Sequence, residues 1–409
     1  MNRTFDVVIA GSGIAGLTLA ALLSRDERTE RLNVRLIDAG ERPHFDAEAD
    51  VALRVSAIAA GSARLYDALG AWNAVTAARA SPFRKMRVWD AGRNVEGPET
   101  LHFDAAEFAL RELGFIVENT LLQHALLQIL DDAGAALSFG KQIEAVHSAA
   151  NDRVDVVCAD GETLPADLLV GADGASSAVR QQAKIGVTSW NYPQSAFVTH
   201  VAPEKDHQEC AWQRFLPAGP LALLPLRCGR VSIVWSTTPE EAEQASRASD
   251  SALGAMLTEA SDCVLGELSA SGERGTFPLR AQYAVRYVAP RMALIGDAAH
   301  SIHPLAGQGA NLGISDAAEL AKVIHDAIAV GEHPGDLPAL RRYERARKGA
   351  NSAMLYFVDT LNRLFASPST PTSALRRTGM RLFNRSGPVR RRVAAVALGL
   401  QPRPWDRFR

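Results

Sequence analysis

Apolar and polar positions at the start of the chain predict a strand, a helix and a second strand in succession. Residues 5–10 form a largely apolar, β-branched run, typical of a strand buried on both faces of a parallel sheet. A glycine-rich turn at residues 11–16 precedes an apolar helical stretch at 17–23, and residues 33–37 predict a second strand that ends at Asp38. This βαβ unit predicts an α/β fold.

Weaker patterns extend this prediction along the chain. Residues 56–69 have a helical pattern, while residues 230–235 indicate a strand in a region rich in strand signals. Short apolar runs at 166–171 and 292–296 each lead into a Gly and an Asp. After Ala317 the pattern is mainly helical, with apolar residues at helical spacing at Leu340, Tyr343, Ala350, Met354, Phe357 and Leu361.

Composition narrows the class of protein. The 409 residues are 47% hydrophobic and 22% charged, which suits a soluble protein with a large core in two or three domains. A net charge of −2 gives no general attraction to nucleic acid. The four widely spaced cysteines favour neither a metal site nor a disulfide and fit a reducing cytoplasm. Since the chain has neither a signal peptide nor an apolar run of about 20 residues, we expect a cytoplasmic protein that does not cross a membrane.

The glycine-rich turn has the form GxGxxG and predicts a dinucleotide-binding, Rossmann-like domain. Gly11 permits the tight turn, Gly13 allows a pyrophosphate to approach the backbone, and Gly16 lets the helix pack against the sheet. The helix N-terminus would attract the phosphates, and Asp38 would accept hydrogen bonds from an adenosine ribose. The motif does not separate FAD from NAD, and glycines that serve packing alone are the structural alternative.

Two further motifs follow the later apolar runs. Asp297 lies at a strand end, where a carboxylate can bind a sugar-alcohol hydroxyl, and the turn at 307–313 can approach a flat ring. A helix that starts near Asn311 would direct its N–H groups at that ring and stabilise the negative charge of a reduced flavin. Asp173 follows the other run, where capping of the next helix is the plain explanation. The joint occurrence of all three motifs favours a flavin site.

Together these motifs resemble those of the class A flavoprotein monooxygenases, the group that includes p-hydroxybenzoate hydroxylase. The resemblance covers residues 5–361 and is greatest to the ubiquinone-biosynthesis hydroxylases at residues 53–58, 112–119, 122–123, 277–279 and 300–309. It implies a Rossmann-like FAD-binding domain, an interleaved α+β substrate domain and a helical C-terminal region. We expect the FAD-binding domain at residues 1–80, 109–185 and 277–360, the substrate domain at 81–108 and 186–276, and a basic helical tail at 361–409.

The resemblance also implies the cofactor contacts. Gly11, Gly13 and Gly16 would hold the FAD pyrophosphate, and Asp38 would bind the adenosine ribose. Arg54 and Gln123 would contact the phosphate and ribityl region. The remaining expected contacts are Asp297 to the ribityl chain, Asp173 between cofactor and nicotinamide, and Pro304, Gly307, Gly309, Asn311 and Leu312 to the isoalloxazine. We expect no metal.

The activity implied by the resemblance is hydroxylation of a phenol ring. NADPH or NADH would reduce the flavin, and one atom of O2 would be transferred to a prenylated phenol or quinone precursor of ubiquinone. The catalytic candidates are His303 and Pro304. His303 would assist deprotonation of the phenol or would only fix the turn by hydrogen bonds. A hydroxylase of a small soluble phenol and a non-catalytic flavin-binding scaffold are the alternative functions.

The C-terminal tail is strongly basic. Between Asp359 and Asp406 there are nine arginines and no acidic residue, and Leu375, Leu382 and Phe383 fall on one helical face. These features indicate peripheral contact with the inner face of the membrane. Pairing of the arginines with acidic patches of the same protein, or docking of a partner in a biosynthetic complex, remain as alternatives.

Overall fold

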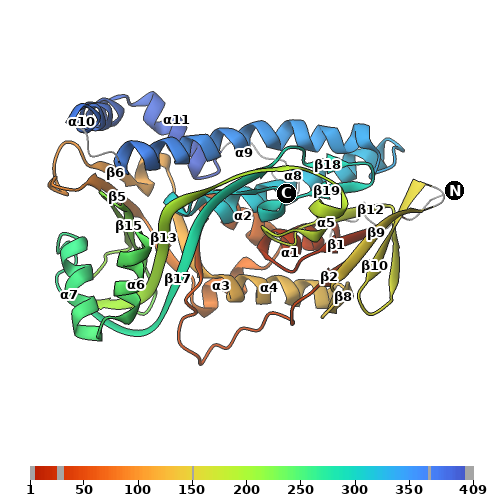
Figure 1. Ribbon diagram of the computed structural model, residues 1–409, viewed down its shortest axis with the longest axis horizontal. Coiled ribbons are helices and arrows are strands. Elements are labelled where there is room, and N and C mark those ends of the chain that lie inside the picture. The colour runs from red at the N-terminus through yellow and green to blue at the C-terminus, as the bar shows by residue number, and fades with distance from the viewer. Residues whose placement is uncertain (1–4, 25–31, 150–151, 367–369, 401–409) are drawn as a thin grey trace.

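A parallel sheet and a larger, mainly antiparallel sheet are the two main layers of the computed structural model (Figure 1). The structure describes residues 5–24, 32–149, 152–366 and 370–400. Arg403 and Asp406 of the tail therefore lie outside the described residues. The expected α/β class with a helical C-terminal region is confirmed.

The parallel sheet carries the glycine-rich turn at the end of a central strand. Its order is β18-β19-β12-β1-β2-β8, and each neighbouring pair is parallel except β18 with β19. The bounds are β1 Phe5–Ala10, β2 Leu32–Asp38, β8 Ala136–Phe139, β12 Leu168–Gly171, β18 Val288–Ala289 and β19 Met292–Leu294. Because both faces of this sheet are covered, its central strands are almost uniformly apolar.

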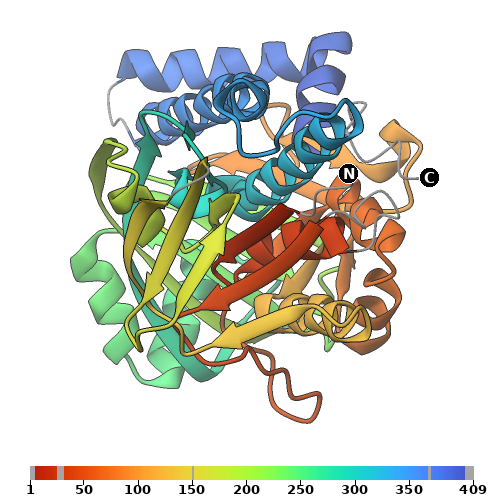
Figure 2. The same cartoon turned by 90° about the vertical axis from the view of Figure 1, so that its right-hand side faces the viewer.

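Helices and a second small sheet cover the parallel sheet. On one side pack α1 (Ile14–Ser24), α4 (Asn119–Asp132) and α8 (Gln308–Ala329), and α1 contacts both of the other helices. On the other side lies a three-stranded sheet that contacts β1 through β11 (Figure 2). Its bounds are β9 Ile143–Ala149, β10 Arg153–Cys158 and β11 Thr163–Ala166.

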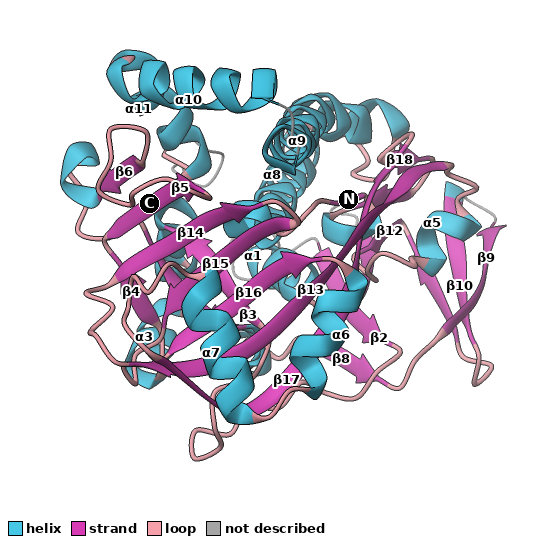
Figure 3. Ribbon diagram, turned by 60° about the vertical axis from the view of Figure 1, so that its left-hand side comes forward, coloured by secondary structure: helices cyan, strands magenta, loops and turns pink. Residues whose placement is uncertain are grey.

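The large sheet has the order β20-β17-β13-β16-β15-β14-β5-β6. Its bounds are β5 Lys85–Asp90, β6 Leu101–Asp104, β13 Val187–Pro203, β14 Cys210–Leu216, β15 Gly219–Pro225, β16 Val231–Thr237, β17 Leu268–Ala284 and β20 His300–Ser301. Helices α6 (Pro239–Arg247) and α7 (Asp250–Ala260) cover one face and enclose Leu223 and Trp235 in an apolar cluster (Figure 3). The expected domain boundary at residue 276 falls inside β17, because this strand pairs with β13 along almost its whole length.

The prediction of a helix at residues 56–69 is wrong for the first part of this range. Val55–Ala59 forms strand β3, and only Ala60–Ala68 forms helix α2. β3 pairs with the distant strand β7 (Gly114–Glu118), so this long-range pairing overrides the local helical pattern. β4 (Ser81–Phe83) completes the same small sheet, although its residues were expected in the substrate domain.

Three helices end the described chain. α9 (Leu337–Ala366) runs over both main layers, and α10 (Thr370–Arg385) and α11 (Pro388–Ala397) follow it at one end of the molecule (Figure 1). Tail arginines form ion pairs with the β5–β6 region: Arg376–Asp90 at 3.2 Å, Arg381–Glu99 at 2.6 Å and Arg390–Glu107 at 2.9 Å. Pairing with acidic groups of the same protein thus accounts for part of the tail's charge. Among the described helices, none has the length and apolar character that a membrane span requires.

Candidate cofactor and active site

The glycine-rich turn joins β1 to α1, and its three glycines have different surroundings. Gly11 has a φ of 111°, a conformation that favours glycine. A Cβ at Gly16 would overlap the carbonyl oxygen of Gly11, so glycine is needed for α1 to start this close to the strand. A Cβ at Gly13 would meet no atom of the described residues within 4 Å. The open space beside Gly13 fits a turn that binds a pyrophosphate.

Two of the expected contact residues also shape this turn. The two carboxylate oxygens of Asp38 accept the N–H groups of Ser12 at 2.5 Å and of Gly40 at 2.7 Å. Gln123, on α4, donates from Nε2 to the carbonyl oxygen of Ser12 at 2.8 Å. A carboxylate has about four acceptor positions, so Asp38 retains capacity for ribose hydroxyls.

Asp297 lies in the turn after β19. Its side chain is exposed, yet the surrounding protein desolvates it and raises its pKa, an effect that the positive charges of His300 and Arg54 oppose. The structure therefore brings Arg54 close enough to act on Asp297, as a shared cofactor site requires. Arg54 also lies over the ring of Phe277, 5.2 Å from its centroid.

A buried carboxylate that the sequence analysis did not single out fixes this turn from behind. Asp316, on α8, accepts the N–H of Gly296 at 3.2 Å and lies 2.5 Å from Nε2 of His300. Its other oxygen accepts from Arg347 Nε at 2.7 Å and Asn351 Nδ2 at 2.9 Å. Burial raises the pKa of Asp316, but the charge interactions with His300 and Arg347 and the hydrogen bonds from His300 and Asn351 outweigh it and lower the pKa to about 2. The signal in the sequence that could have identified Asp316 is its position on the apolar face of a predicted helix, where a charged residue needs a buried partner.

Helix α8 begins at Gln308, earlier than the expected start near Asn311. The side chain of Asn311 accepts the N–H of Ala59 and the hydroxyl of Ser62, both at 2.9 Å, and donates to the carbonyl oxygen of Ala57 at 2.8 Å. It therefore ties α8 to β3 and α2. A Cβ at Gly309 would find open space within 4 Å, as far as the described chain extends. The side chain of Leu312 is buried.

Asp173 makes the contacts expected of a residue that caps the next helix, which is the structural alternative to a role in cofactor binding. Its oxygens accept from the hydroxyl of Ser177 at 2.5 Å and the N–H of Val179 at 3.1 Å, at the start of α5 (Ala178–Gln182). The buried Arg180 then donates to the carbonyl oxygens of Ala175 at 2.7 Å and Ala298 at 2.8 Å. Arg180 thus joins the Asp173 motif to the turn that carries Asp297.

His303 is buried beside Pro304, with both ring nitrogens bonded to protein. Nδ1 accepts the N–H of Leu305 at 3.2 Å, so Nε2 carries the proton and donates to Gln194 Oε1 at 3.3 Å. Burial lowers the pKa of His303 to about 4, which keeps the imidazole neutral. These are the hydrogen bonds that a turn-fixing role requires. The ring of Tyr192 meets the His303 ring edge-on, with 5.0 Å between the ring centroids.

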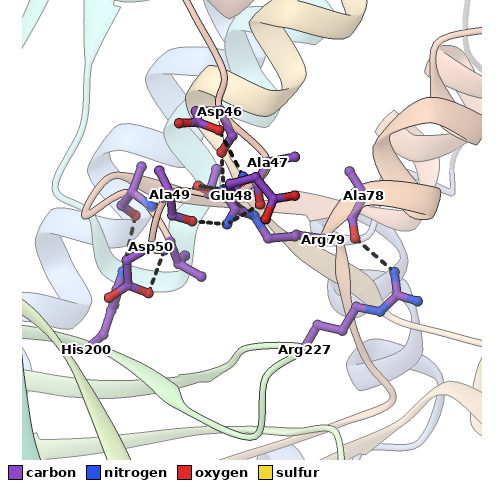
Figure 4. A network of polar contacts seen from close by, with 12 residues as sticks. Asp46, Ala47, Glu48, Ala49, Asp50, Ala78, Arg79, His200 and Arg227 are labelled. Carbon is purple, nitrogen blue, oxygen red and sulfur yellow. Dashed lines mark hydrogen bonds and ion pairs between the residues drawn. The ribbon is translucent and has the colours of Figure 1, made fainter.

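The loop between β2 and β3 is held by side chains that the sequence analysis did not single out (Figure 4). Arg79 donates to the carbonyl oxygens of residues 46, 47 and 49 and pairs with Glu118 at 3.0 Å. Arg230 pairs with Asp50 at 2.8 Å at the other end of the loop. Because Arg54 follows this loop directly, these contacts fix the backbone from which it extends.

Comparison with known proteins agrees with the interpretation of these residues as a flavin site. A family model described as an FAD binding domain matches residues 4–357. The chain belongs to this FAD-binding family. The expected FAD cofactor is confirmed, and within the described part of the FAD-binding chain no three His, Cys, Asp or Glu side chains gather as a metal site.

Named relatives match nearly the whole length of this FAD-binding protein. It is 37% identical to the 3-demethoxyubiquinol 3-hydroxylase of Escherichia coli, over 98% of this chain and 100% of that protein. It is 37% identical to the ubiquinone hydroxylase UbiL of Rhodospirillum rubrum, over 98% and 92% of the two chains. The human ubiquinone biosynthesis monooxygenase COQ6 is 35% identical, over 97% and 93%. The resemblance to ubiquinone-biosynthesis hydroxylases and the class of FAD-dependent aromatic monooxygenase are thereby confirmed.

Solved structures share the fold of the FAD-binding family member. PqsL of Pseudomonas aeruginosa, in complex with 2-aminobenzoylacetate, has a TM-score of 0.75 at 24% identity, over 92% of this chain and 99% of that one. HpxO of Klebsiella pneumoniae, complexed with FAD and uric acid, has a TM-score of 0.71 at 20% identity, over 97% of each chain.

Proposed function

We propose that this enzyme hydroxylates the ring of a prenylated phenol precursor of ubiquinone, with NADPH or NADH as reductant and O2 as co-substrate. The observation that carries the proposal is the full-length similarity to hydroxylases whose names specify ubiquinone-type substrates. The proximity of Arg54 to Asp297 and the hydrogen bonds that fix the start of α8 support it. A small soluble phenol as substrate, and a flavin-binding scaffold without activity, are the competing functions.

Bound FAD supplies the redox chemistry, while the protein binds and orients the reactants and limits access of water. The backbone of Gly11, Gly13 and Gly16 would hold the pyrophosphate, and Asp38 the adenosine ribose. Gln123 and Arg54 would contact the phosphate and ribityl region, Asp297 would bind the ribityl chain, and Asp173 would lie between the cofactor and the nicotinamide. Pro304 and the backbone at Gly307, Gly309, Asn311 and Leu312 would face the ring, where the α8 N-terminus would stabilise negative charge.

His303 is proposed as a positioning residue. A neutral imidazole whose Nδ1 already accepts a backbone N–H has no lone pair left to remove a phenol proton. Its contribution is to hold the turn at Pro304 and Leu305, and through Gln194 to connect that turn to β13.

Deletion of the gene tests the proposed function. We expect a prenylated precursor that lacks one ring hydroxyl to accumulate, and the purified protein to release FAD on denaturation. Oxidation of NADPH or NADH by the purified protein, stimulated by the accumulated precursor, would further support the proposed function. Stimulation by small soluble phenols alone would favour the first alternative, and FAD retention without any stimulated oxidation would favour the scaffold.

We also propose that the C-terminal tail contacts the anionic inner face of the cytoplasmic membrane. Val389, Val393 and Val396 share one face of α11 by their spacing, and all three are exposed. Arg385 and Arg392 are exposed nearby in sequence. A partly apolar, partly basic face suits an anionic lipid surface, where an enzyme meets a lipid-tailed substrate. Docking of a partner in a biosynthetic complex is the alternative.

A further inference from the structure

A cavity of about 180 Å³ lies between the small sheet and the turn that joins β15 to β16. Its apolar wall is formed by Val51, Val55, Ile116 and Leu226, which belong to or pack against one apolar cluster. None of these residues has a role in the cofactor contacts proposed above. The cavity is therefore a separate feature that needs its own explanation.

The charged groups of the cavity are already engaged within the protein. Arg79 is neutralised by Glu118 and bonded to three loop carbonyls. Arg227, at the opening, directs Nη1 at the carbonyl oxygens of Thr76 at 2.8 Å and Ala78 at 3.2 Å, at the end of α3 (Trp72–Ala78) (Figure 4). Because both guanidinium groups serve the backbone, the cavity is better suited to an apolar group than to a phosphate.

Strand β3 connects the cavity with the proposed ring site. Val55 lines the cavity, and Ala57 lies on the same face of the strand, roughly 7 Å further along. Ala57 in turn contacts the ring-facing loop, since a Cβ at Gly307 would lie 2.9 Å from the Cβ of Ala57. The cavity wall and the contact with the ring-facing loop therefore lie next to each other on one strand.

We propose that this cavity binds the apolar, isoprenoid part of the substrate adjacent to the ring. The inference rests on the proposed function and adds a specificity site to it. Leu226 and Val51 then determine how strongly the enzyme prefers a substrate with a tail over one without.

The first test fills the cavity with Leu226→Trp in the FAD-loaded enzyme. We expect kcat/KM for a prenylated phenol to fall roughly tenfold or more, because the pocket no longer accepts the extra apolar groups. The same phenol with a methyl group in place of the tail should react as before. Val330→Trp, at a position that is 70% exposed, is the control and should change neither value.

The second test uses wild-type protein, so it does not depend on folding of a variant. Cys228 lines the cavity opening and is exposed, and Cys263 is an exposed thiol outside the cavity. The prenylated phenol should slow alkylation of Cys228 and leave Cys263 unaffected, while the methyl analogue should protect neither thiol.

The outcomes separate the two proposals. Wild-type enzyme that hydroxylates neither phenol contradicts the proposed function. If both phenols are hydroxylated, an unchanged preference in Leu226→Trp with no tail-dependent protection of Cys228 overturns the cavity proposal alone. Protection of Cys228 by reduced nicotinamide instead of the prenylated phenol overturns it as well.

Discussion

The Nε2 atom of His300 lies 2.5 Å from Oδ2 of Asp316, and both side chains are buried. Asp316 also holds Arg347 and the backbone of Gly296, so one carboxylate links α8, α9 and the turn that carries Asp297. The geometry of the proposed ribityl site thus depends on a residue that does not face it.

Asp316→Asn should destabilise the protein strongly. The substitution leaves Arg347 buried without its counter-charge, a change that costs about 3–5 kcal/mol in comparable buried pairs. Urea denaturation of the apoprotein measures the loss in unfolding free energy. Asp326→Asn is the matched control on α8, because Asp326 is half exposed and pairs with Lys322 near the surface. Its effect should stay below about 1 kcal/mol. Equal effects of the two substitutions would show that the buried pair is not a structural anchor.

Two glycines of the same turn should respond differently to alanine. Gly13→Ala should leave apoprotein stability almost unchanged, since its Cβ enters open space, but should weaken FAD binding by blocking the phosphates. Gly16→Ala should lower the melting temperature of the apoprotein itself, because its Cβ would overlap the backbone of Gly11. Thermal unfolding without flavin, combined with FAD titration, separates the effects. Normal FAD affinity in Gly13→Ala would remove this turn from the pyrophosphate site.

The buried His303 predicts a pH dependence of stability. Burial lowers its pKa from 6.5 to about 4, so above pH 6.5 it is neutral in both folded and unfolded chains. As the pH falls from 6.5 to 4, the unfolded chain binds a proton that the folded chain refuses. Stability therefore decreases over this window, by up to about 3 kcal/mol.

His303→Gln should remove this part of the pH dependence. Unfolding free energies of wild type and variant, measured from pH 4 to pH 8, give the comparison. His147→Gln, at an exposed position on β9, serves as the control. Identical pH profiles for wild type and His303→Gln would contradict the neutral, buried state.

The tail proposal predicts charge-dependent binding to vesicles. Arg385→Glu combined with Arg392→Glu should reduce co-sedimentation with anionic liposomes, since each arginine contributes on the order of 1 kcal/mol near such a surface. High salt should have the same effect, and neutral liposomes should bind little protein. Arg341→Glu with Arg345→Glu makes the same charge change on exposed positions of α9 outside the tail. Binding that is insensitive to lipid charge, salt and the tail variant would reject membrane contact.

Local features of the fold were predictable, and features that depend on distant partners were not. The strand, glycine turn and helix at residues 5–24 follow from their own sequence, because the roles of Gly11 and Gly16 are decided within the turn. The strand at Val55–Ala59 was misread as helix, because its partner β7 lies some sixty residues later.

The same limit applies to the candidate site. Asp173 and Asp297 were found from motifs, but Asp316 acquires its role only when α8 and α9 pack together. Similarly, no local sequence pattern predicts that Arg79 binds the loop before Arg54, or that Arg376 forms an ion pair with Asp90.

The order of strands in the parallel sheet has a consequence for biosynthesis. β1 pairs with β2 soon after both are made, but its other neighbour, β12, begins at Leu168, and β12 gains β19 only at Met292–Leu294. During translation, one edge of β1 therefore stays unpaired until β12 has been synthesised. One edge of β12 then stays unpaired until β19 has been synthesised. Such long-range pairing folds slowly and leaves strand edges open to aggregation. Nascent chains that end before residue 292 therefore lack the strand that pairs with this edge of β12.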